Sequence, residues 1–172
     1  MNLQSNDFEL FGLPMQFAQE RAAIDARWRE LQRHAHPDKF VAQGAAAQRL
    51  ALQWSVRINE AYQRLKDPLR RAAYLCELHQ ISVQAENNTA MPAAFLSQQL
   101  AWREALEDAS GVADLQAVAA QVQAAQADAW AACAKCLDVQ HDYAQAAEQV
   151  KSLMFMARLL EDVQARLALL DK

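Results

Sequence analysis

The 172-residue sequence has little of what builds turns and strands, with only three glycines and four prolines. A chain with so few of these residues lacks the turns that β-hairpins or a many-stranded sheet require. Alanine and glutamine, both helix formers, are abundant. Hydrophobic residues make up 53% of the chain and the formal net charge is only −4, which excludes a disordered tail. The composition predicts an all-α fold.

Membrane and export segments are also missing. No run of about 18 uncharged apolar residues is present, so we expect no membrane span and no membrane partner. The first seven residues contain neither the basic nor the apolar part of a secretory signal. Three cysteines, Cys76, Cys133 and Cys136, are an odd number and too few for a disulfide framework. These absences favour a reducing, cytoplasmic location.

Motifs typical of catalysis are lacking. The sequence has no Walker loop, no dinucleotide-binding glycines and no Ser-His-Asp arrangement. His34, His79 and His141 have no serine, cysteine or paired carboxylate at a useful spacing. We therefore expect that the chain is not an enzyme and that it uses no cofactor and no metal.

Charge is divided unevenly along the chain. Residues 1–78 contain 11 Lys and Arg against 9 Asp and Glu, whereas residues 79–172 contain 6 against 12. This asymmetry indicates two surfaces that meet different partners. Neither half carries the strongly basic field that nucleic acid requires, so we expect no nucleic-acid partner.

The first half is predicted to be a helical hairpin with short flanking helices. Residues 7–12 form a turn that Asp7 caps and Gly12 stops. A helix over 17–35 ends before Pro37, and a second over 45–65 ends before Pro68. A short helix follows over 69–78. The apolar stripes of the two long helices are Phe17, Ile24, Trp28 and Leu31, and Ala47, Leu50, Trp54, Ile58, Ala61 and Leu65.

The second half is predicted to be a three-helix bundle. Residues 79–92 lose the helical periodicity and form a linker, so the domains are 1–78 and 93–172. Helices over 93–109, 112–139 and 142–170 are joined by short turns, which makes neighbours antiparallel. The stripes of the last two helices are Leu115, Val118, Val122, Ala125, Ala129 and Cys136, and Tyr143, Val150, Leu153, Met154, Ala157, Leu160 and Leu167.

One short motif, His36-Pro37-Asp38-Lys39, lies between the two helices of the hairpin. Proline fixes φ and removes an amide donor, so the connection is rigid and loses little entropy when it docks. The tip then presents the carboxylate of Asp38 and the imidazole of His36 beside Lys39. A simple helix stop followed by a cap is the alternative interpretation.

In this context the motif resembles the J-domain, the module that activates DnaK-type chaperone ATPases. The segments DFELFGLP, HPDK and INEAYQRLKDP carry the resemblance over residues 1 to about 75. It implies that the His-Pro-Asp tip docks on the chaperone. It also implies that the basic face of the preceding helix, with Arg27, Arg29 and Arg33, meets an acidic surface of that partner. An ordinary solvated helix face is the alternative.

A more specific resemblance covers essentially the whole chain. The segment INEAYQRLKDPLRRAAYLCEL, a linker and then AAFLSQQLAWREALED look like the J-type co-chaperone of iron–sulfur cluster biogenesis, the HscB type. This implies a protein whose bundle binds a cluster scaffold protein of the IscU type and delivers it to a DnaK-type chaperone of the HscA type. The lack of a targeting segment favours the bacterial cytoplasm, although a processed organellar chain would look the same. The scaffold-contacting positions of the family correspond to Leu96, Leu100, Glu104, Asp108 and Phe155. Ser97 and Ala101 depart from the larger or acidic residues usual in the family.

Helix geometry gives independent support for a binding face on the first bundle helix. Leu96 and Leu100 point about 100° and 140° away from Phe95, which lies on the core stripe. Glu104 and Asp108 continue the same ridge, and Phe155 lies outside the main stripe of the last helix. An exposed apolar patch with an acidic extension suits a docking partner. Packing between the helices of the bundle is the alternative.

Cys133 and Cys136 form a CxxC pair, a spacing also found in zinc and redox sites. The pair lies inside a predicted helix near its core stripe, and the sequence has no second CxxC, so we interpret these cysteines as core residues. Two other functions remain open at this point: an assembly adaptor whose hairpin only resembles a J-domain, and a metal- or redox-sensing helical protein.

Overall fold

The computed structural model describes residues 2–83 and 91–170, which form two compact units, Met1–Leu75 and Cys76–Lys172. Every regular element in these described ranges is a helix, so the all-α prediction is confirmed. The first unit ends at residue 75 rather than 78. The Cys76 thiol donates to the Tyr143 carbonyl at 3.7 Å, a contact within the second unit. Of the predicted linker, residues 84–90 lie outside the described ranges.

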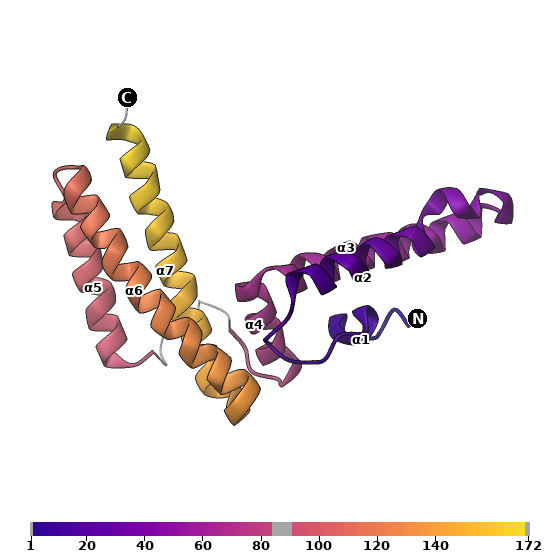
Figure 1. The fold of residues 1–172 in the computed structure, drawn as a ribbon, viewed down its shortest axis with the longest axis horizontal. Helices are drawn as coiled ribbons and strands as arrows, with labels where there is room; N and C mark the ends of the chain where they lie inside the picture. Colours follow the sequence, from indigo (N-terminus) through magenta and orange to yellow (C-terminus); the bar gives the residue numbers. More distant parts are fainter. Residues whose placement is uncertain (1, 84–90, 171–172) are drawn as a thin grey trace. The chain divides into compact units, whose positions relative to one another are not determined.

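The first unit is built on two long helices, α2 (Arg21–Ala35) and α3 (Ala45–Lys66), which lie side by side and are joined by the 3-10 helix η1 (Pro37–Gln43) (Figure 1). The predicted hairpin and the bounds of its second helix are confirmed. From α3, Ile58, Ala61 and Leu65 are completely buried. Leu50 was predicted on this core stripe, but it is 50% exposed because it lies where the helices border a groove.

The predicted start of α2 is wrong, because Phe17 lies in the segment before the helix. Its carbonyl accepts a hydrogen bond of 2.8 Å from Arg71 Nε, and the Arg71 guanidinium lies 5.0 Å from its ring centroid. Arg71 belongs to α4 (Pro68–Leu78), so a contact between distant residues holds Phe17 outside the helix. Trp28 is only half-buried and stacks on Tyr62 at 4.8 Å.

The short helix α1 (Asp7–Phe11) is capped by Asn6, not by Asp7 as predicted. Asn6 Oδ1 accepts from the Glu9 amide at 2.9 Å, and Glu9 Oε2 accepts from the Asn6 amide at 3.1 Å. These two bonds form a reciprocal capping box. Gly12 ends the helix in the left-handed conformation, at φ 62°.

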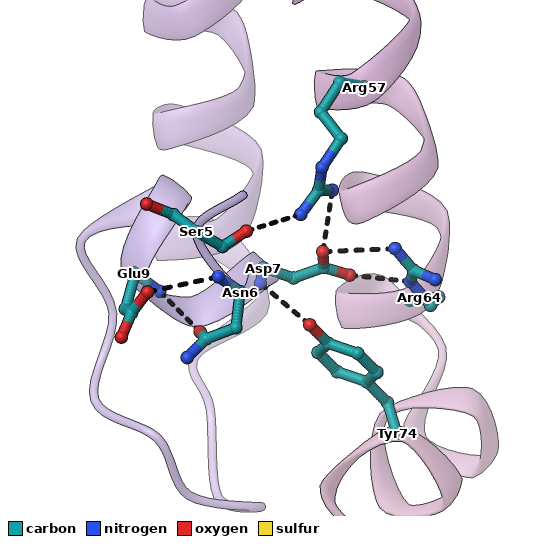
Figure 2. Close-up of polar contacts among 7 residues, drawn as sticks. All are labelled: Ser5, Asn6, Asp7, Glu9, Arg57, Arg64 and Tyr74. Atoms are coloured by element: carbon teal, nitrogen blue, oxygen red, sulfur yellow. Dashed lines mark hydrogen bonds and ion pairs between the residues drawn. The ribbon is translucent and has the colours of Figure 1, made fainter. Parts of the chain in front are cut away.

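Asp7 instead anchors α1 to α3 and α4 (Figure 2). Its carboxylate is fully buried and accepts two hydrogen bonds from Arg64, at 2.7 and 3.1 Å. Arg57 Nη1 lies 2.7 Å from the same carboxylate. The backbone amide of Asp7 donates to the Tyr74 hydroxyl at 3.0 Å. A buried carboxylate needs such partners, since an unpaired charge is expensive to desolvate.

The second unit contains α5 (Ala93–Asp108), α6 (Val112–Lys135) and α7 (Tyr143–Leu170), with a π-turn, η3 (Cys136–Gln140), extending α6 (Figure 1). The three predicted bundle helices are confirmed. Their long core seam lies between α6 and α7. It buries the predicted Leu115, Val118, Val122, Val150 and Leu153, and also Met156, Leu159 and Val163.

Part of the predicted stripe of α7 is wrong, because the buried face is rotated toward Met156 and Leu159. The side chains of Tyr143, Met154, Ala157, Leu160 and Leu167 are half-buried instead. Helix α5 buries only Trp102 completely. Its C-terminal end is held by Arg166 of α7, which donates to the carbonyls of Leu106 and Ala109. None of the helices in the described residues is long and apolar enough to span a bilayer.

Candidate partner-binding surfaces

The His-Pro-Asp tripeptide lies at the end of the hairpin, where α2 stops. His36 has an extended backbone (φ −63°, ψ 125°), and Pro37 opens η1 at a position where its missing amide costs nothing. His36 Nδ1 accepts from the Asp38 amide at 3.3 Å and lies 3.5 Å from Asp38 Oδ2. The Asp38 side chain is nevertheless 86% exposed. The connection is thus a 3-10 helix rather than an open loop, and it presents a solvent-exposed carboxylate.

The basic residues around this tip differ in how far they are engaged within the protein. Three of these residues, Arg29, Arg33 and Lys39, are exposed, and their side chains make no hydrogen bond or ion pair with the described residues. Arg27 is committed to the fold: it donates to the Phe11 carbonyl at 2.7 Å and pairs with Glu30 at 2.5 Å. Of the three predicted arginines, only Arg29 and Arg33 present fully available guanidinium groups.

Charge at the start of α2, away from the tip, is already neutralised within the protein. Arg21 donates to Asp25 at 2.9 Å, and this hydrogen bond is the main reason that the pKa of Asp25 lies below its ordinary value. The Tyr62 hydroxyl also donates to Asp25 at 2.9 Å. The positive field of the helix therefore comes from the residues closer to the tip.

A groove that the sequence analysis missed lies beside the tip, between α2, η1 and α3. It encloses about 390 Å³ and is mainly apolar, with Phe40, Leu50 and Trp54 among its walls. Alanines at positions 35, 47 and 51 leave the space open. Their alternation with larger apolar residues on one helix face was the only signal for it in the sequence.

On α5 the predicted ridge is exposed. Leu96 is 42% and Leu100 60% exposed, and Glu104 and Asp108 are exposed on the following turns. Phe155 was predicted to belong to the same exposed patch, but it is half-buried. Its ring meets the edge of Phe95 at a centroid distance of 6.0 Å. Ser97 and Ala101 are exposed on the same helix.

The whole chain is similar to curated bacterial co-chaperones. It is 44% identical over 174 residues to the co-chaperone protein HscB homolog of Burkholderia multivorans, with 99% of each chain covered. The corresponding protein of Burkholderia cenocepacia is 43% identical with the same coverage. The chain belongs to the HscB family of co-chaperones. The family resemblance predicted from the sequence is confirmed.

A family model and solved structures agree with this membership. The model described as the HSCB C-terminal oligomerisation domain matches residues 91–164. HscB from Vibrio cholerae has a TM-score of 0.80 and 37% identity, covering 94% of this chain and 97% of that one. Human HscB, at 24% identity and a TM-score of 0.89, covers 96% of this chain and 84% of its own and shows the shared fold alone. The predicted HscB architecture, a J-domain hairpin followed by a helical bundle, is therefore confirmed.

The cysteines of this HscB-family chain lie in the core of the second unit. Cys76, Cys133 and Cys136 are all buried, as the core interpretation predicted. Burial raises the pKa of Cys76 to about 11 and that of Cys133 to about 12, and it also raises the pKa of Cys136. A reactive or metal-binding cysteine needs a lowered pKa. No cluster of side chains that could hold a metal ion occurs among the described residues.

Proposed function

We propose that this HscB-family co-chaperone stimulates ATP hydrolysis by a DnaK-type chaperone of the HscA kind, and that it delivers to that chaperone an iron–sulfur scaffold protein of the IscU kind. The hairpin tip, with His36, Pro37, Asp38 and Lys39, acts on the chaperone. The α5 ridge binds the scaffold. The chain then needs no catalytic group of its own, since the chaperone hydrolyses the ATP. Its place of action is the bacterial cytoplasm.

The observation that carries the first half is the exposure of Asp38 on a fixed backbone. The hydrogen bond from its amide to His36 and the ring of Pro37 hold the turn, so little entropy is lost when a partner binds. The carboxylate is left to accept hydrogen bonds from that partner. Such charge-assisted bonds are stronger than neutral ones.

The encounter with the chaperone is steered electrostatically by Arg29, Arg33 and Lys39. Exposed charges at the rim of an interface mainly accelerate association and select partners of opposite sign. Their side chains make no ion pair with the described residues, so their charges are available to a partner. An acidic surface on the chaperone is the matching partner.

The α5 ridge supports the second half of the proposal. Leu96 and Leu100 are one turn apart and exposed, so together they form an apolar patch that a partner can cover. Glu104 and Asp108 extend the ridge with negative charge. Because one chain carries both surfaces, it raises the effective concentration of the scaffold at the chaperone.

Replacement of Asp38 tests the proposal. The D38N variant of the full chain keeps the size of the side chain but loses the charge. We expect its stimulation of the chaperone ATPase to fall about tenfold or more, since a hydrogen bond to a charged group is worth roughly 1.5–3 kcal/mol. Glu20→Gln is the matched control, because Glu20 is exposed, makes no capping bond and lies far from the tip in sequence.

Unchanged stimulation by D38N would contradict the proposal. It would favour the adaptor alternative, in which the hairpin has no effect on any DnaK-type ATPase. A loss with D38N together with full activity of Glu20→Gln supports a specific role of the tip carboxylate.

A further inference from the structure

A second groove lies between α5 and α7, next to the ridge. It encloses about 380 Å³, and Leu106, Phe155 and Leu159 give it an apolar floor, with Glu107, Arg158 and Asp162 also in its lining. Arg103 stands at its α5 edge. Its guanidinium carbon lies 5.2 Å from the centroid of the Phe155 ring, within cation–π range.

Apart from this ring contact, Arg103 is uncommitted. It is exposed and makes no hydrogen bond or ion pair with any described residue. A guanidinium has five N–H donors in a planar fork that matches a carboxylate. The guanidinium of Arg166, by contrast, already donates hydrogen bonds to the carbonyls of Leu106 and Ala109. The donors of Arg103 are available to a partner.

Helix geometry places Arg103 within the ridge and not behind it. It follows Leu96 by seven residues and Leu100 by three, so it lies about 20° and 60° around the helix axis from them. Its contact with Phe155 puts it between the two leucines on α5 and the aromatic ring on α7. A partner that covers Leu96, Leu100 and Phe155 must therefore cover Arg103 too.

We infer that Arg103 is a specificity-determining residue of the scaffold-binding surface and that it pairs with a carboxylate on the scaffold protein. The inference rests on the proposed function of the ridge. A guanidinium that is desolvated without an acceptor costs free energy, so an apolar partner surface lacking an acidic group is disfavoured. Glu104 and Asp108 on the other flank face basic groups of the same partner.

The test is a calorimetric titration of full-length variants with the purified IscU-type scaffold, at low and at high salt. We expect Arg103→Glu to weaken binding about tenfold or more at low salt, because like charges then oppose each other. Arg103→Leu keeps an apolar cover over Phe155 and is expected to weaken binding about threefold to tenfold while reducing its salt dependence. Lys135→Glu is the matched control, since it makes the same charge change at an exposed site on α6 and is expected to bind like wild type.

Wild-type affinity of Arg103→Glu would overturn the inference. Equal losses in Arg103→Glu and Arg103→Leu with unchanged salt dependence would also overturn it, because the charge of Arg103 would then contribute nothing to binding. Restoration of Arg103→Glu binding by a carboxylate-to-lysine change on the scaffold would support the pairing and identify its acceptor.

A double variant, Leu96→Ala with Leu100→Ala, separates this inference from the proposed function. If the double variant binds the scaffold normally, the ridge itself is not the binding surface and the proposal fails. If the double variant loses binding while Arg103→Glu keeps it, only the role of Arg103 fails.

Discussion

The hairpin of the first unit and helix α5 of the second carry the two proposed binding surfaces, but they are held in very different ways. The hairpin combines two long helices with a buried ion cluster around Asp7. Helix α5 is held by one completely buried side chain, Trp102, and by the capping of its C-terminal end by Arg166. Much of the hairpin sequence forms contacts within the unit, whereas most of the surface of α5 is exposed.

The chemistry of the two surfaces differs in the same way. The tip presents charge, with Asp38 on η1 and with Arg29 and Arg33 on the preceding helix, and charge acts over distance and is weakened by salt. The ridge presents Leu96 and Leu100, and apolar contact acts only once surfaces meet. The proposed roles match this difference: a tip that finds and triggers a chaperone would use the first kind of interaction, and a ridge that retains a scaffold would use the second.

The largest loss of stability is expected when the ion cluster of the hairpin unit is removed. In Asp7→Ala the guanidinium groups of Arg57 and Arg64 lose their shared carboxylate. We expect the free energy of unfolding to fall by roughly 3 kcal/mol, the lower end of the range for a broken buried pair, since Arg64 is 41% exposed. Urea unfolding of the full chain measures the change, with Glu20→Gln as control. A variant as stable as wild type would show that the ion cluster does not hold α1.

Two single substitutions on α5 compare a buried residue of the helix with an exposed one. Trp102→Ala removes the one completely buried side chain of the helix and should cost about 3 kcal/mol of stability. Leu100→Ala, two positions earlier and 60% exposed, should change stability by less than about 0.5 kcal/mol. Thermal unfolding followed by circular dichroism distinguishes them. Equal losses would mean that Leu100 packs within the bundle and is not available to a partner.

The smallest effect expected at neutral pH concerns the core thiols. Because burial raises the pKa of Cys76 to about 11 and of Cys133 to about 12, both stay protonated when the native protein is at pH 8. A thiol reagent should react slowly with native protein and rapidly once it unfolds. Fast reaction in the native state would instead support the redox-sensing alternative.

The same raised pKa values set the sign of a pH effect. The unfolded thiols ionise near pH 9, whereas the folded ones stay neutral until about pH 11 or 12. The contribution of the neutral thiols to stability is therefore complete below pH 9 and is lost as pH rises from there through the folded pKa values. Cys133→Ala should flatten this decline, which urea unfolding at pH 8 and pH 10 would show.

The sequence was most informative where local rules decide the structure. The helix over 45–65, the stop before Pro37 and the exposure of Leu96 and Leu100 follow from periodicity, from the geometry of proline and from helix angles. The His-Pro-Asp tip was found because three adjacent residues carry it. No long-range knowledge was needed for any of these features.

The predictions failed where distant residues compete for the same group. Asp7 had the right type and spacing for a cap, yet Arg57 and Arg64 of α3 bind its carboxylate, and Asn6 caps instead. Phe17 fitted the apolar stripe of α2 but is held by Arg71 of α4. Arg27 shares a helix with Arg29, and only the position of the Phe11 carbonyl shows that it is already engaged.

The ion cluster around Asp7 also bears on how this protein can be shortened. Trimming the chain to begin after Gly12 would remove a helix of only five residues, which looks harmless by length. It would strip the counter-ion from two guanidinium groups on α3 and leave the Tyr74 hydroxyl without its amide donor. Solvent would then have to replace the lost carboxylate, so this opening turn stabilises helices that come much later in the chain.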